Sequence, residues 1–183
     1  MSLAIMFSKE VHAYTGVELS PHYLLRQFGL RGDALAAYIG PCRVATDHLV
    51  DWEDRLKGDR IEAKWMLHLQ GEFFGPSLRE AVLLQRLLIA SVAENLADRR
   101  ILRRGNDLYA LDRKLSVSIV TASPVSRLLH LGINIDPEGA PVPAIGLSEL
   151  GLMPETWLPG LLERFAVEWA QIDWACAKVR PVV

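Results

Sequence analysis

The chain has few of the features that define disulfide-stabilised, membrane-spanning or polyanion-binding proteins. Its 183 residues contain only two cysteines, Cys42 and Cys176, which form no C-x-x-C pair. This argues against a disulfide scaffold or a thiolate zinc cluster and suits a reducing compartment. No uncharged run approaches the roughly 20 apolar residues of a membrane helix. The net charge of −2 provides no basic excess for nucleic acid. We therefore expect a cytoplasmic protein with neither a membrane nor a nucleic acid as its partner.

Common catalytic and nucleotide-binding motifs are missing as well. The sequence has no G-x-x-x-x-G-K-[ST], G-x-G-x-x-G, G-x-S-x-G or H-E-x-x-H pattern. One acidic cluster near a histidine invites a metal assignment, and its members are His48, Asp51, Glu53 and Asp54. Charged residues on a short exposed helix are usually just solvated. No metal site is therefore predicted.

The pattern that is present indicates one domain spanning residues 1–183. Half of the residues are hydrophobic, which is enough for a substantial core. Alternating, β-branched or leucine-rich segments predict six strands, at 3–7, 34–39, 65–74, 107–111, 114–122 and 127–136. Only Asp112 and Arg113 lie between the predicted strands 107–111 and 114–122, and this spacing predicts a tight antiparallel hairpin.

Three helices are predicted. Ser77 and Glu80 form a capping-box pattern at the start of a helix over 77–99. An apolar stripe predicts a core-covering helix over 159–178, and a shorter helix is expected after the cap candidate Thr46. Since strands come in runs rather than in βαβ units, we predict an α+β fold with a mainly antiparallel sheet packed by helices.

Three predicted strands carry polar faces that supply the candidate ligand site. Successive strand residues point to opposite sides of a sheet. The polar faces consist of His68, Gln70 and Glu72; of Lys114, Ser116 and Ser118; and of His130, Gly132, Asn134 and Asp136. A solvated sheet face is the alternative. However, imidazoles, an amide, small serines and a glycine suit the close approach of a ligand. We therefore predict that the three faces share one site.

Lys114 is the candidate catalytic residue of this site. A strand lysine followed by small serines can hold positive charge beside an oxygen that becomes negative during acyl or phosphoryl transfer. The alternative is an edge-strand lysine that discourages aggregation. His130 could orient a ligand or exchange protons near neutral pH. Arg104, in the basic turn 103–106, could bind phosphate or carboxylate, or lie in a surface loop.

The order of these segments resembles the biotin/lipoate protein ligase superfamily. The resemblance covers about residues 66–150, and the nearest pattern is that of lipoyl(octanoyl) transferases. The matching features are the helix 77–99, the basic turn 103–106, the segment Asp112-Arg113-Lys114-Leu115-Ser116 and His130-x-Gly132-x-Asn134. Over nearly the whole chain the sequence resembles the archaeal and bacterial domain of unknown function 366 family. The segments that match this family include Phe28-Gly29-Leu30-Arg31-Gly32-Asp33, Gly40-Pro41-Cys42, Met66-Leu67-His68, Arg113-Lys114-Leu115-Ser116 and Ser123-Pro124-Val125-Ser126.

The resemblance implies a biotin/lipoate protein ligase-like fold, which is also that of class II aminoacyl-tRNA synthetases. It further implies that Lys114 contacts the carboxyl or phosphate-ester oxygen of an acyl group or acyl-adenylate. Two features depart from the superfamily. The transferases' cysteine nucleophile has no counterpart in 144–148, and only Lys57-Gly58-Asp59-Arg60 stands where the ligases have a glycine-rich, arginine-containing loop.

Three hypotheses follow. In the first hypothesis the chain is a ligase or acyltransferase that activates a small carboxylate, and ATP and magnesium are the cofactors that adenylation would require. Alternatively, it is a non-catalytic module that binds a carboxylate or nucleotide in the same place. The third hypothesis is a protein-interaction domain that uses Trp157, Trp169 and Trp174. Sheet edges and the apolar last helix also permit a homodimer.

Overall fold

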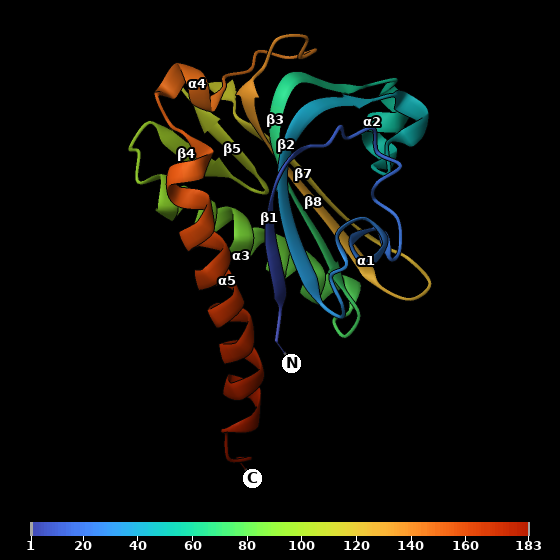
Figure 1. Cartoon of the computed structure of the whole chain (residues 1–183), viewed down its shortest axis with the longest axis vertical. Coiled ribbons are helices and arrows are strands. Elements are labelled where there is room, and N and C mark those ends of the chain that lie inside the picture. Colours follow the sequence, from blue (N-terminus) through green and yellow to red (C-terminus); the bar gives the residue numbers. More distant parts are fainter. Residues whose placement is uncertain (1, 183) are drawn as a thin grey trace.

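A central sheet with helices on one side and an irregular segment on the other forms the body of the molecule (Figure 1). The computed structural model describes residues 2–182. Its strands are β1 (Ala4–Val11), β2 (Ala34–Val44), β3 (Ile61–Phe73), β4 (Ile101–Arg104), β5 (Asp107–Ala110), β6 (Arg113–Lys114), β7 (Ser116–Ala122) and β8 (Arg127–Asp136). Its helices are α1 (Tyr23–Phe28), the 3₁₀ turn η1 (Thr46–His48), α2 (Trp52–Lys57), α3 (Leu78–Leu96), α4 (Leu147–Leu150) and α5 (Pro154–Ala177).

The main sheet has the strand order β1-β2-β3-β8-β7, and a small second sheet has the order β4-β5-β6. Only the β1–β2 pair is parallel, whereas the other pairs in both sheets are antiparallel. The prediction of an α+β fold with a mainly antiparallel sheet is confirmed. None of the helices within residues 2–182 has the length and apolarity that crossing a membrane requires.

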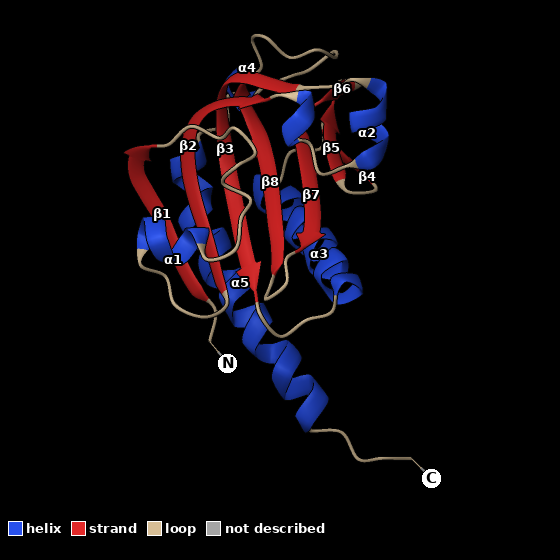
Figure 2. Ribbon diagram, turned by 90° about the vertical axis from the view of Figure 1, so that its right-hand side faces the viewer, coloured by secondary structure: helices blue, strands red, loops and turns tan. Residues whose placement is uncertain are grey.

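The core lies on the side of the main sheet that α3 and α5 cover (Figure 2). Leu67 pairs with Ile133 and Leu69 with Leu131, so these side chains share the helix side of the sheet, where all are fully buried. Burial of each such side chain stabilises the fold by about 1.5–3 kcal/mol. The predicted capping box is present, because Ser77 Oγ accepts from Glu80 N–H while Glu80 Oε2 accepts from Ser77 N–H.

The opposite side of the main sheet is covered by residues 12–28, which include α1 (Figure 2). Leu24 is buried against two small β2 residues, Ala34 and Ala36, which let the covering segment approach the sheet closely. The sequence analysis predicted neither this cover nor α1, since α1 has only six residues and carries no side-chain cap.

The structure corrects two of the predicted helix starts. Helix α2 is capped by Asp51, whose carboxylate accepts from Glu53 N–H and Asp54 N–H, and Thr46 belongs to η1 instead. Helix α5 begins at Pro154 rather than at Pro159, which lies inside it. Pro154 stands at the first position of α5, where a missing N–H costs little.

Two strand predictions also change. Strand β4 was not predicted, and the segment predicted as one strand over 114–122 is divided at Leu115 between the two sheets. The hairpin turn lies one residue earlier than predicted. Its two residues, Leu111 and Asp112, have φ angles of 50° and 58°, which is the left-handed backbone that a tight hairpin turn requires. Here it forms without glycine.

Candidate functional site

Helix α2 lies beside β7 at the edge of the main sheet (Figure 2). A cleft lies here, lined by residues of α2, β3, β7 and β8. It consists of two cavities of about 160 Å³ and about 50 Å³. They adjoin, since Leu49, Asp54, Ile61 and Val117 line both of them. We call these two cavities together the α2 cleft. Lys114 and Asn134 line its larger cavity, whereas Tyr14 and His130 line the smaller one.

Lys114 is held firmly at one end of this cleft. Its Nζ lies 2.9 Å from Asp107 Oδ2. Its backbone N–H donates to Pro143 O over 3.0 Å, and its carbonyl accepts from Ile145 N–H and from Asn134 Nδ2. An ammonium group carries three N–H donors, so Lys114 can bind Asp107 and a ligand oxygen together. This arrangement suits the binding of a carboxylate or a phosphate.

Asp107 orients the lysine, and the sequence analysis did not identify it. Its Oδ1 is buried and has no hydrogen-bond partner within residues 2–182. The hairpin register contained the signal for this pair. Lys114 lies opposite Tyr109, so Asp107, two residues earlier, lies diagonally across on the same face. A correct placement of the turn at Leu111 and Asp112 would have predicted the ion pair.

The interior of the α2 cleft is mainly apolar, with charges near Lys114. Its apolar walls come from Leu49, Ile61, Met66 and Val117. The charged residues that line the larger cavity are Asp54, Asp59, Arg60, Glu62 and Lys114. Burial raises the pKa of the Asp54 carboxyl, and the charges of Asp51 and Asp59 add to this effect, whereas Lys114 lowers that pKa. The larger cavity thus has apolar walls together with charged residues of both signs.

The structure does not place Ser116 and Ser118 with the histidines, which corrects the predicted shared face. Ser118 pairs with Leu131, so both side chains point to the helix side of the sheet. Ser118 Oγ accepts from Gln85 Nε2 over 2.8 Å, and Ser116 Oγ accepts from Leu108 N–H over 2.8 Å. The chain crosses between sheets at Leu115, and this break puts Lys114 and the serines into different registers.

His68 and His130 form a buried pair beneath residues 12–28, which we call the covering segment. His68 Nδ1 lies 3.0 Å from His130 Nε2, and His68 Nε2 lies 3.3 Å from Gly40 O. The Tyr14 ring stacks on His130 with centroids 3.7 Å apart. Burial lowers the pKa of His68 to about 3 and lowers the pKa of His130 well below its usual value. Both imidazoles are therefore neutral near pH 7, and His130 forms part of the inner end of the α2 cleft.

Gln70 and Glu72 bind the covering segment. Tyr38 Oη donates to Gln70 Oε1 over 2.8 Å, and Gln70 Nε2 donates to Glu18 O. The Glu72 carboxylate accepts from His22 N–H over 2.8 Å and from Ser126 Oγ over 2.7 Å. The predicted polar face of β3 therefore holds residues 12–28 of the same chain.

The remaining predicted residues lie in three different settings. Gly132 is a packing glycine, because a Cβ there would lie 2.3 Å from Met66 Sδ. Asn134 lines the α2 cleft, and its side chain ties Lys114 O and Ile145 O together. Arg104 is exposed, pairs with Asp112 over 2.9 Å and is not among the residues that line the cleft. Of the predicted site, Lys114, Ser116 and Asn134 line the larger cavity of this cleft, and Ser118 and His130 line the smaller one. The hydroxyl groups of the two serines are bonded to Leu108 and Gln85 instead.

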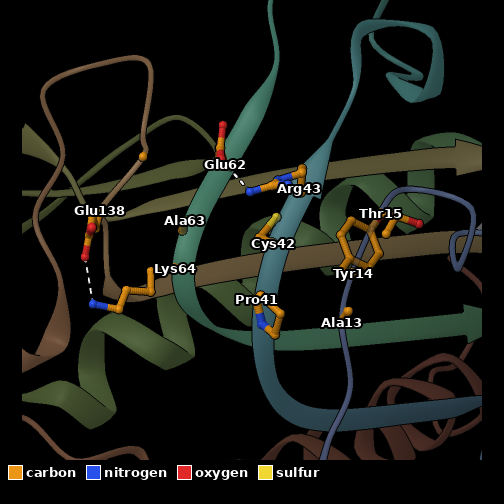
Figure 3. Close-up of a pocket in the computed structure, with 11 residues that line it drawn as sticks. Ala13, Tyr14, Thr15, Pro41, Cys42, Arg43, Glu62, Ala63, Lys64 and Glu138 are labelled. Atoms are coloured by element: carbon orange, nitrogen blue, oxygen red, sulfur yellow. Dashed lines mark hydrogen bonds and ion pairs between the residues drawn. The ribbon is translucent and has the colours of Figure 1, made fainter.

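A larger hollow of about 560 Å³ lies beside the last residues of β2 and the first residues of β3 (Figure 3). Its basic side chains are already paired, Arg43 with Glu62 over 3.3 Å and Lys64 with Glu138 over 2.7 Å (Figure 3). Cys42 lies in its wall, and burial raises the pKa of that thiol to about 12. A thiol with this pKa stays protonated near neutral pH and is a poor nucleophile.

Within residues 2–182, no three His, Cys, Asp or Glu side chains are grouped so that they could hold a metal ion.

Comparison with known sequences identifies the relatives of the chain. The family model described as "Domain of unknown function (DUF366)" matches residues 3–180. The uncharacterized protein MJ0805 of Methanocaldococcus jannaschii is 30% identical over 159 residues, which cover 82% of this chain and 72% of that protein.

Solved structures include one full-length counterpart and several ligases. A protein of unknown function from Pyrococcus horikoshi is 36% identical with a TM-score of 0.92 and full coverage of both chains. P. falciparum LipL1, solved with lipoate, has a TM-score of 0.56 at 11% identity, covering 99% of this chain and 64% of that one. Biotin protein ligase from Aquifex aeolicus, solved with biotin and ATP, has a TM-score of 0.52 at 17% identity, covering 90% and 68%. At these identities the ligases show a shared fold alone, and they confirm the predicted biotin/lipoate ligase-like architecture.

Proposed function

The chain belongs to the domain of unknown function 366 family and has the biotin/lipoate protein ligase fold, and from this premise we propose that it binds a small carboxylic acid in the α2 cleft and activates its carboxyl group. In this proposal a carboxyl oxygen of the ligand lies against Lys114 Nζ. The apolar part of the ligand lies beneath Leu49, between Ile61 and Val117. LipL1 and the Aquifex ligase were solved with lipoate and biotin, both of them carboxylic acids with a largely apolar body.

One observation carries the proposal: a lysine held by Asp107 lines a cavity that has apolar walls from Leu49, Ile61, Met66 and Val117. A fixed positive charge stabilises an oxygen that gains negative charge in a transition state, because no reorganisation is needed as that charge develops. A hydrogen bond to a charged group contributes about 1.5–3 kcal/mol. Lys114 therefore supplies both affinity and transition-state stabilisation.

The proposed activation is adenylation. A carboxylate oxygen of the ligand attacks the α-phosphorus of ATP, the bond to the β-phosphate oxygen breaks, and pyrophosphate leaves. An acceptor nucleophile then attacks the acyl carbon of the acyl-adenylate, and AMP leaves. Magnesium would enter with the nucleotide, since it is held largely by substrate phosphates in such sites. The larger cavity has only about 160 Å³, so this proposal requires the cleft to open further when the nucleotide binds.

A non-catalytic binding module is the second candidate. The small volume of the cleft favours it, because sites for larger ligands usually have about 300–1,000 Å³. The protonated Cys42 thiol is also consistent with it, since that thiol lies outside the cleft and cannot serve as an acyl acceptor. In this case the protein holds the acid without releasing pyrophosphate.

Calorimetric titration with octanoate, lipoate and biotin tests the binding step. At least one acid should bind, and Lys114→Ala should weaken its binding by roughly 10- to 100-fold, in line with the loss of one charged hydrogen bond. Lys64→Ala is the matched control. Lys64 also pairs with carboxylates, on β3, but it lines the other hollow. Equal affinity of the wild type and Lys114→Ala rejects the proposed site.

Pyrophosphate release with ATP and the bound acid separates the two candidates. Release that is lost in Lys114→Ala and kept in Lys64→Ala supports adenylation. Binding without release identifies the non-catalytic module. Because Asp54 and Asp59 line the same cavity as Lys114, the panel should also contain acids that carry an amino group.

A further inference from the structure

The second half of α5 extends well past the body of the molecule (Figure 1). The buried residues of this helix, Pro154, Leu158, Leu161, Leu162 and Phe165, all lie in its first half. Beyond them, large apolar side chains are exposed, with Val167 at 56% and Trp174 at 64%. Most helical stability in proteins comes from the packing of an apolar face. The projecting half of α5 thus has an apolar surface that its own chain leaves uncovered.

A groove of about 530 Å³ lies between this projecting half and α3. Leu83, Leu84 and Leu87 form the α3 wall, and Trp169, Ile172 and Cys176 form the α5 wall. Leu83 is 59% exposed, whereas Trp169 is partly buried through stacking on Phe73 with centroids 5.1 Å apart. The groove is therefore apolar, partly preformed and open to solvent.

The charged residues that line the groove have one sign, and those in the segment directly after α5 have the other. The three charged residues that line the groove, Asp33, Glu80 and Asp173, are all acidic. Residues 178–182 directly after the helix include Lys178 and Arg180 and no acidic residue. The same segment carries the exposed Val179 and Val182. An acidic apolar groove and a basic apolar helix end are thus complementary, and one chain provides both.

We propose that the protein forms a homodimer in which the second half of α5 and residues 178–182 of one copy occupy the α3/α5 groove of a second copy. The two α5 helices run antiparallel about a two-fold axis, so that Lys178 and Arg180 of each copy lie beside the acidic groove lining of the other. A two-fold arrangement uses one surface twice and closes on itself. The groove lies on the helix side of the main sheet and the α2 cleft on the other side, so this proposal is independent of the proposed function.

Sedimentation velocity of the full chain over a wide concentration range tests the dimer. Wild type should sediment as a dimer that dissociates on dilution. Trp174→Asp and Leu83→Asp, on the two complementary surfaces, should each yield monomers with unchanged far-ultraviolet circular dichroism. The matched control is Trp52→Asp, since Trp52 is 70% exposed on α2, on the other side of the sheet. That variant should remain dimeric.

Charge reversal tests the orientation of the helices. Lys178→Glu combined with Arg180→Glu should raise the dimer dissociation constant by at least about tenfold, because two exposed ion pairs are lost from each copy. High salt should reduce this difference. A wild type that is monomeric at all concentrations overturns the proposal. A dimer that survives both Trp174→Asp and Leu83→Asp, or one that Trp52→Asp dissociates, also overturns it.

Discussion

Acidification should destabilise the protein through the buried pair His68 and His130. The rings of Tyr14 and Tyr38 and the carbonyl of Gly40 surround the pair. The folded-state pKa of His68 is lowered to about 3, whereas a histidine in the unfolded chain titrates near 6.5. The unfolded chain therefore binds a proton that the folded chain cannot bind. The stability contribution is complete above the unfolded value and is lost as the pH falls from there toward the folded value.

The magnitude follows from the two pKa values of His68. Between pH 7 and pH 5 this histidine alone lowers the free energy of unfolding by about 2 kcal/mol. The pKa of His130 is lowered in the same direction, by burial and by the neighbouring His68, so its protonation adds to the loss. The expected loss is a large part of the roughly 5–15 kcal/mol that stabilises a typical domain.

Urea unfolding followed by tryptophan fluorescence at several pH values measures this loss. His68→Gln and His130→Gln should reduce the pH dependence between pH 7 and pH 5, whatever their effect at pH 7. His48→Gln is the control, because His48 is exposed and lies outside the pair. If the unfolding free energy of the wild type does not change over this range, or if His48→Gln reduces its pH dependence as much as His68→Gln does, the reasoning is refuted.

Two further predictions concern packing and thiol chemistry. Gly132→Ala should destabilise the protein by about 1–3 kcal/mol, because its Cβ would lie 2.3 Å from Met66 Sδ. Adding Met66→Ala should cost less than the two single changes together, and strict additivity in urea unfolding would contradict the contact. In the folded Leu83→Asp variant, which should be monomeric, Ellman's reagent should modify the exposed Cys176 rapidly and the buried Cys42, whose pKa is raised to about 12, only after unfolding. Two fast-reacting thiols, or a Cys176→Ser variant that still reacts rapidly, would disprove this.

The sequence predicted the sheet faces well wherever one strand stays in one sheet. Alternation correctly separated Leu67 and Leu69 from His68 and Gln70, because one side of β3 meets the apolar core. The same logic failed after Leu115. There the chain leaves the small sheet for the main one, and local alternation contains no information on such a crossing.

Composition correctly indicated that the polar faces of β3 and β8 meet something other than water. The sequence could not show that this is residues 12–28 of the same chain. The contacts of Glu72 with His22 and of Gln70 with Glu18 join residues about 50 positions apart. Pairings of this kind arise from the tertiary fold, whereas the Asp107–Lys114 pair depended only on a local hairpin and was within reach of sequence analysis.

The stacking of Tyr14 on His130 has a consequence for ligand size. These rings belong to the inner end of the α2 cleft, and Lys114 lies at the other end. An acid whose carboxyl group binds the lysine therefore has only the intervening space for its hydrocarbon tail. Under the proposed function the aromatic pair would limit the length of the tail, and replacing Tyr14 with a smaller residue should allow longer acids to bind.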